Sequence, residues 1–142
     1  MRVVIDASVA MKWILRDAVR EAQTGAALSL LRCIQAGSDE AIQPPHWLAE
    51  VAAVLARLRP EIAESTVDLL DALELPVAAD PAIYRRAVRL AVELDHHLFD
   101  TLYHAVALER DAVFVTSDDG YRRKASHLGA VADLAAWAVS TG

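Results

Sequence analysis

The sequence predicts a single α/β domain with a doubly wound, mostly parallel sheet flanked by helices. Short apolar, β-branched runs alternate along the 142 residues with segments of helical periodicity, and this alternation is typical of right-handed crossovers between parallel strands. No repeat, low-complexity tract or Gly/Ser linker divides the chain, so residues 1–142 form one predicted domain. With 55% apolar and 24% charged residues, the composition excludes a disordered tail protein and a collagen-like repeat.

Four apolar runs predict the strands. The first covers residues 2–5, and residues 112–116 give the clearest signal of a buried strand. Shorter candidates lie at 75–78 and 130–132. Because ligands bind beyond the carboxyl ends of the strands in such sheets, the residues that follow these runs are the first candidates for a functional site.

Apolar positions that recur at helical spacing predict the helices, and several have recognisable ends. Gly37 suits a C-terminal cap, and Asp80 followed by Pro81 suits a helix start. The predicted helices cover 19–37, 47–58, 60–75, 81–94 and 99–110, followed by a short helix to about 128 and a terminal helical stretch.

Charge and cysteine content limit the classes of protein. The net charge is −6, which by itself disfavours a nucleic-acid partner, although an acidic cluster that holds metal ions adds negative charge without repelling a phosphate. A single cysteine, Cys33, excludes an intramolecular disulfide framework and a four-thiolate zinc site; we expect it to be a small buried apolar residue. The amino-terminal apolar run is too short for a signal peptide or membrane span, so we expect a cytoplasmic protein with no membrane partner.

Four carboxylates form the candidate site. Asp6 and Asp118 each follow a predicted strand, whereas Glu50 and Asp100 lie near predicted helix starts among apolar neighbours. If all four converge, their mutual repulsion requires a cation, and Mg²⁺ or Mn²⁺ prefers oxygen ligands of this kind. Each acid taken singly also suits a helix cap or a solvated first turn, so spacing alone leaves both interpretations open.

Four segments carry a family resemblance. Residues 3–13 (VVIDASVAMKW) resemble the opening of a PIN domain, in particular that of VapC-type toxins of toxin–antitoxin pairs. Residues 45–55 (PHWLAEVAAVL) resemble the second acidic motif of that family, 99–107 (FDTLYHAVA) the third, and 115–119 (VTSDD) the fourth. The motifs occur in the family's order over residues 3–125, nearly the whole chain.

The resemblance implies a Mg²⁺-dependent endoribonuclease that acts as a homodimer and is restrained by a cognate antitoxin protein. On matching positions, it implies that the metal-site acids are Asp6, Glu50, Asp100 and Asp118. Ser8 and Thr116 match hydroxyl positions that support the site, and Asp119 matches an accessory acid. Two positions depart from the family pattern: Ala53 stands where an asparagine is common, and His104 stands where an apolar residue is usual.

Basic and histidine residues near these motifs have two interpretations. Arg122, Arg123 and Lys124 directly follow the fourth motif and could contact RNA phosphates, or they could form a solvated helix turn. His97 and His104 would share a helix side with Asp100 only if the helix began before residue 99, so we expect surface histidines, His96 among them, rather than a zinc or iron site.

Two other functions are compatible with the sequence. The first is a catalytically silent PIN-fold binding protein. The second is a receiver-like phosphoacceptor domain, which Asp6 disfavours because it lacks the adjacent acid that such domains carry.

Overall fold

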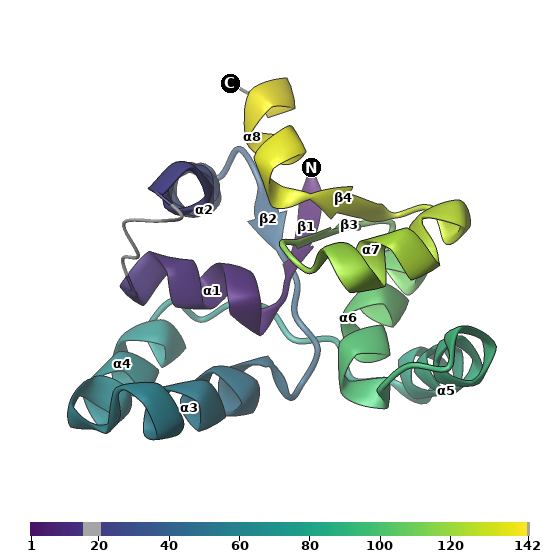
Figure 1. Ribbon diagram of the computed structural model, residues 1–142, viewed down its shortest axis with the longest axis horizontal. Coiled ribbons are helices and arrows are strands. Elements are labelled where there is room, and N and C mark those ends of the chain that lie inside the picture. The colour runs from purple at the N-terminus through teal and green to yellow at the C-terminus, as the bar shows by residue number, and fades with distance from the viewer. Residues whose placement is uncertain (16–20, 142) are drawn as a thin grey trace.

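A parallel sheet lies at the centre of the structure, a computed structural model that describes residues 1–15 and 21–141 (Figure 1). Its strands are β1 (Arg2–Ile5), β2 (Glu40–Ala41), β3 (Val113–Thr116) and β4 (Val131–Asp133), in the spatial order β2-β1-β3-β4. Every pairing is parallel. The predicted doubly wound α/β fold is therefore confirmed, and the carboxyl ends of β1 and β3 meet at one edge of the sheet.

Helices connect and cover the strands (Figure 1). Their bounds are α1 (Ala7–Ile14), α2 (Glu21–Ala36), α3 (Trp47–Leu58), α4 (Pro60–Asp71), α5 (Pro81–Leu94), α6 (Leu98–Glu109), α7 (Asp119–Ala125) and α8 (Leu134–Thr141), with a short 3₁₀ turn at Ser126–Leu128. None of the described helices is long and apolar enough to cross a membrane.

Alternation along the strands divides the core into two layers. Val4 and Phe114 point to one face of the sheet, where α3, α5 and α6 pack. Val3, Ile5 and Val115 point to the other face, where α2 and α8 pack. These strand residues are at most 2% exposed, so both faces of the sheet are covered, as expected for parallel strands.

The structure corrects several predicted elements. The helix predicted over 60–75 ends at Asp71, because Glu74 adopts a left-handed conformation (φ 51°) and Pro76 follows. The predicted strand 75–78 is only a single parallel bridge between Gln43 and Val77, since Pro76 has no N–H to extend a ladder. Strand β2 was not predicted, because two residues are too short to carry a periodicity. The start of the helix predicted over 19–37 falls partly outside the described residues.

Candidate active site

Asp6 lies at the junction between β1 and α1 and is held by three donors. Its Oδ1 accepts a hydrogen bond from the Ser8 hydroxyl and one of 3.1 Å from the backbone N–H of Val9, which caps α1. Its Oδ2 accepts a hydrogen bond from the Thr116 hydroxyl at the end of β3. The capping interpretation of Asp6 is thus confirmed, and Ser8 and Thr116 lie against this carboxylate as the motif comparison implied.

Burial dominates the electrostatics of Asp6. It raises the pKa of the Asp6 carboxyl above its ordinary value, despite the hydrogen bonds from Ser8, Thr116 and Val9, and the negative charge of Asp100 raises the pKa further. A carboxylate in this environment gains stability from a neighbouring cation.

Gln43 fixes the backbone that leads into Asp6. Its side-chain amide donates to the Ile5 carbonyl at 2.7 Å and accepts from the Ile5 N–H at 2.9 Å. Gln43 is 1% exposed and lies 38 residues away in sequence. No local pattern marks such a residue, so the sequence analysis missed it.

The Thr116 hydroxyl connects the backbone of Asp118 to the Asp6 carboxylate. The Thr116 hydroxyl that donates to Asp6 accepts a 3.0 Å hydrogen bond from the backbone N–H of Asp118. The Asp118 carboxylate caps α7 by accepting from the N–H of Tyr121 at 3.1 Å. Asp118 therefore also serves as a helix cap, at the strand end where the sequence placed it.

Glu50 lies in the first turn of α3 and is bound by two side chains. Its Oε1 accepts a 2.6 Å hydrogen bond from the Tyr103 hydroxyl and lies 3.3 Å from His46 Nε2. Burial opposes ionisation of Glu50, but the hydrogen bonds from His46 and Tyr103 outweigh it and lower the Glu50 pKa. The same His46 nitrogen donates to the Phe99 carbonyl at 2.7 Å.

Asp100 lies in the first turn of α6 and is bound by a histidine. His96 Nε2 donates to Asp100 Oδ2 at 2.7 Å, and Lys124 Nζ lies 3.3 Å from the other nitrogen of that ring. His97 is the N-cap residue of α6, outside the helix. The predicted break in helical register at His97 is therefore confirmed, although α6 begins one residue earlier than predicted.

Tyr103 is affected by the charges of three of the acids. Burial raises the pKa of Tyr103, as do its hydrogen bond to Glu50 and the negative charges of Glu50, Asp6 and Asp100. Asp6, Glu50 and Asp100 therefore all act on this hydroxyl, whereas Asp118 is connected to Asp6 through its backbone N–H and the Thr116 hydroxyl. Tyr103 lies three residues after Asp100, a spacing that puts both on neighbouring positions of a helix surface.

Other predicted residues face elsewhere. Asp119 is bound by Arg122 at 2.8 Å, and Arg123 Nε donates to the Asp119 backbone carbonyl at 3.3 Å. Lys124 lies beside a different acid, because its Nζ is 3.3 Å from the ring of His96, which donates to Asp100.

The chemistry of the four acids fits a hard divalent cation, because every one of them offers carboxylate oxygens. The positions of the described side chains do not form a metal site in this structure. Within residues 1–15 and 21–141, no group of three or more His, Cys, Asp or Glu side chains is arranged so that it could hold a metal ion. Protein donors bind each of the four carboxylates instead. Their role as metal ligands stays a prediction.

The prediction that His104 lies on the surface is wrong. The residue is 0% exposed, with Nδ1 2.8 Å from the Tyr121 hydroxyl and Nε2 2.7 Å from the Gly129 carbonyl. Both ring nitrogens therefore have a hydrogen-bond partner, at a position where the family pattern usually has an apolar residue. Cys33 was predicted to be a small buried apolar residue, and the structure shows it only partly buried.

His104 is expected to give the protein a pH-dependent stability. Burial lowers the pKa of His104 below its ordinary value of 6.5, so the unfolded chain binds this proton at a higher pH than the folded chain does. His104 therefore stabilises the fold above about pH 6.5, and this contribution falls as the pH drops toward the native pKa, by about 1.4 kcal/mol per unit of pKa lowering. Urea unfolding of wild type and His104→Gln between pH 8 and pH 5 measures it: the difference between the two proteins should shrink with falling pH. A pH-independent difference would contradict the assignment.

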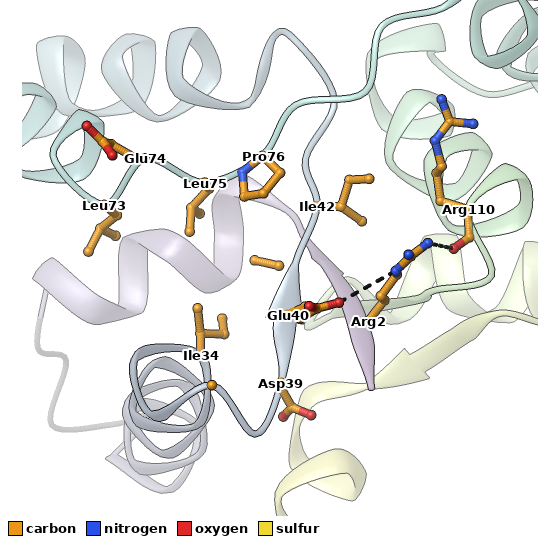
Figure 2. A pocket seen from close by; sticks show the side chains of 12 residues that line it. Arg2, Ile34, Asp39, Glu40, Ile42, Leu73, Glu74, Leu75, Pro76 and Arg110 are labelled. Atoms are coloured by element: carbon orange, nitrogen blue, oxygen red, sulfur yellow. Dashed lines mark hydrogen bonds and ion pairs between the residues drawn. The ribbon is translucent and has the colours of Figure 1, made fainter.

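A separate pocket of about 550 Å³ lies toward the amino ends of β1 and β2. Figure 2 shows Arg2 bound to both Glu40 and the Arg110 backbone carbonyl, with Leu73 and Leu75 on another side of the pocket. The Arg2 guanidinium lies 3.7 Å from the Glu40 carboxylate and donates to the Arg110 carbonyl at 3.0 Å. None of the four candidate acids lines this pocket.

Comparisons with known proteins match the fold and its sequence motifs. The family model for the PIN domain matches residues 3–126. No curated protein sequence matches the chain. Three solved structures are similar over nearly the whole chain. PAE2754 from Pyrobaculum aerophilum is 20% identical with a TM-score of 0.66, and the match covers 99% of this chain and 94% of that one. VapBC2 from Rickettsia felis, bound to a promoter DNA fragment, is 15% identical with a TM-score of 0.70, and the match covers 94% of this chain and 98% of that one. VapBC-1 from nontypeable Haemophilus influenzae is 16% identical with a TM-score of 0.65, and the match covers 94% of this chain and 98% of that one.

The family match covers far more than half of the chain and includes all four acidic motifs. Together with the parallel sheet and the acids at its carboxyl edge, it shows that this chain belongs to the PIN-domain family.

Proposed function

We propose that this protein is a Mg²⁺-dependent endoribonuclease and the toxin component of a type II toxin–antitoxin pair. The observation that carries the proposal is the environment of Asp6: a partly buried carboxylate whose pKa is raised by desolvation and by the charge of Asp100, at the carboxyl edge of a parallel sheet. Tyr103 links Glu50 to α6, the helix that carries Asp100, and the Thr116 hydroxyl links the backbone N–H of Asp118 to Asp6. Excess negative charge at one place, built from oxygen donors, supports binding of Mg²⁺ or Mn²⁺.

The four acids would hold the metal ion, and hydrogen bonds from neighbouring residues hold these acids in place. Asp6, Glu50, Asp100 and Asp118 are the residues that would hold it, and a bound dication supplies activation of a water and stabilisation of charge on the leaving oxygen of a phosphodiester. Gln43 holds the backbone before Asp6, and the Ser8 and Thr116 hydroxyls orient its two oxygens. Positioning and electrostatics then suffice, and no side chain has to act as a nucleophile.

Of the three basic residues after the fourth motif, Lys124 is the one we propose to contact a substrate phosphate. It lines a pocket of about 380 Å³ with Asp95, His96 and His97, next to Asp100. Arg122 and Arg123 are engaged by Asp119, so we propose a smaller role for them in RNA binding.

Exposed apolar residues support the proposed protein partners, a second copy of this chain and an antitoxin. Tyr84, Val88 and Val92 recur every four residues on α5 and are 41%, 50% and 79% exposed. A pocket of about 370 Å³ between α3 and α4 is lined by alanine and valine side chains together with Glu64 and Asp68. Two of the similar structures are of VapBC proteins, which supports an antitoxin partner.

The proposed homodimer is tested by light scattering of the protein from micromolar to millimolar concentration, which should show the mass of two chains.

One observation favours a second function, that of a catalytically silent binding protein of the PIN fold. Hydrogen-bond donors of the protein itself occupy the four carboxylates. Among the described side chains, no three His, Cys, Asp or Glu residues are arranged so that they could hold a metal ion. A metal has to compete with His96 for Asp100 and with His46 and Tyr103 for Glu50.

RNA cleavage by the wild-type protein separates the two functions. We expect a panel of labelled structured RNAs to be cut in Mg²⁺ or Mn²⁺ and left intact in EDTA, and induction of the protein to arrest growth. Cleavage that persists in EDTA would remove the metal-dependent mechanism. Absence of cleavage in every metal tested would favour the silent binding protein.

A further inference from the structure

Two adjacent residues in the second turn of α6, Tyr103 and His104, are buried and polar. They are 1% and 0% exposed and follow Asp100 on the same helix. Successive residues on a helix point about 100° apart, so the two side chains reach different neighbours. Leucine and phenylalanine would fill this space without burying polar atoms, which cost stability unless they are satisfied.

Tyr103 connects α6 to the acid on α3. Its hydroxyl donates to Glu50 Oε1 at 2.6 Å. Its ring stacks on Phe114 of β3, with the centroids 5.6 Å apart and an angle of 10° between the planes. The ring is thus held by the sheet, and the hydroxyl fixes one oxygen of Glu50 relative to α6.

His104 connects α6 to the acid at the start of α7. Because a carbonyl oxygen only accepts, the 2.7 Å contact to the Gly129 carbonyl places the proton on Nε2. Nδ1 is then an acceptor, and the Tyr121 hydroxyl donates to it at 2.8 Å. The backbone N–H of Tyr121 in turn donates to Asp118 Oδ1 at 3.1 Å. His104 therefore reaches Asp118 through one intervening residue.

We propose that Tyr103 and His104 are positioning residues that set two acids against Asp100: Tyr103 sets Glu50 directly, and His104 sets Asp118 through Tyr121. The inference rests on the proposed metal-dependent function and deepens it. Neither side chain is assigned contact with a substrate or metal. The contacts of Tyr103 lead to Glu50 and those of His104 lead to Asp118. Tyr103 therefore acts on Glu50 and not on Asp118, and His104 acts on Asp118 and not on Glu50.

Crossed double-mutant cycles test this division. Mn²⁺ dissociation constants, measured by electron paramagnetic resonance, are compared for Tyr103→Phe, Tyr121→Phe and His104→Leu in three backgrounds: wild type, Glu50→Gln and Asp118→Asn. In the wild-type background we expect each variant to weaken Mn²⁺ binding by about 10- to 100-fold, as loss of a ligand's supporting partner does. Tyr103→Phe should lose its effect in Glu50→Gln and keep it in Asp118→Asn. The other two variants should show the reverse.

Carboxyl ¹³C chemical shifts in metal-free protein give a second readout that needs no metal. Tyr103→Phe should move the Glu50 carboxyl signal and leave Asp118 in place, whereas Tyr121→Phe should move Asp118 and leave Glu50 in place. Tyr121→Phe removes only a hydroxyl, so it tests the His104 branch even if His104→Leu fails to fold. Tyr84→Phe and His127→Leu are matched controls at exposed positions and should change neither readout.

Equal weakening of Mn²⁺ binding in all three backgrounds would show a general structural role and overturn the inference, as would a shift of both carboxyl signals in every variant. If wild type binds no Mn²⁺, the proposed function fails instead, and the ¹³C shifts alone decide whether Tyr103 and His104 position these two acids.

Discussion

Asp6→Asn and Asp100→Asn should each abolish Mg²⁺-dependent RNA cleavage while leaving the fold intact. Asparagine keeps the size of the side chain and one oxygen acceptor, but it removes a negative charge from a group whose proposed task is to hold a dication. Removal of a single electrostatic group from an active site costs about 10²- to 10³-fold in rate, and loss of the metal itself would cost more. Initial rates on a labelled RNA in Mg²⁺ and in Mn²⁺ measure the effect.

The metal-free stability of Asp6→Asn provides an internal check. Burial raises the Asp6 pKa, so an ionised Asp6 destabilises the fold as the pH rises through its native pKa. At neutral pH the variant should therefore be as stable as wild type or more stable without metal, and Mg²⁺ should raise the melting temperature of wild type more than that of the variant. Asp68→Asn, on the exposed side of α4, is the matched control. Cleavage by Asp6→Asn at the wild-type rate would refute the metal-nuclease function.

Phe114→Ala should lower the free energy of unfolding by about 3–5 kcal/mol, the usual cost of truncating a buried phenylalanine. Phe114 lies in β3, is 2% exposed and packs its ring against Tyr103, His104 and Tyr121. Truncation leaves a cavity beneath three aromatic rings that two helices hold in place, and the structure can fill it only by moving α6 or α7. Urea denaturation followed by circular dichroism measures the change.

Phe99→Ala is the control for this truncation, because the Phe99 side chain is 60% exposed and a change there should cost far less. Similar losses of stability from the two substitutions would contradict the assignment of Phe114 to the core.

The strong elements of the fold could be predicted because their signals are local. Residues 3–5 and 112–115 form uninterrupted apolar runs, and Pro81 and Pro60 mark helix starts that the structure has at those residues. Elements without a local signal were missed or misplaced. Strand β2 exists because Glu40 and Ala41 pair with Arg2 and Val3, and residues 75–78 form only one bridge because the proline in that segment limits the ladder.

The sequence by itself determined the family, the fold class and the identity of the four candidate acids, because the motifs and the strand ends that carry them are written in consecutive residues. Only the tertiary structure decided what supports those acids. Gln43 binds the backbone before Asp6. Tyr103 binds Glu50, although the two residues are 53 positions apart in the sequence. The burial of His104 was decided in the same way, since its partners Tyr121 and Gly129 come from segments 17 and 25 residues further along the chain. Periodicity identifies a buried helix face, but a hydrogen bond between distant segments depends on how the helices pack, and no local pattern encodes that.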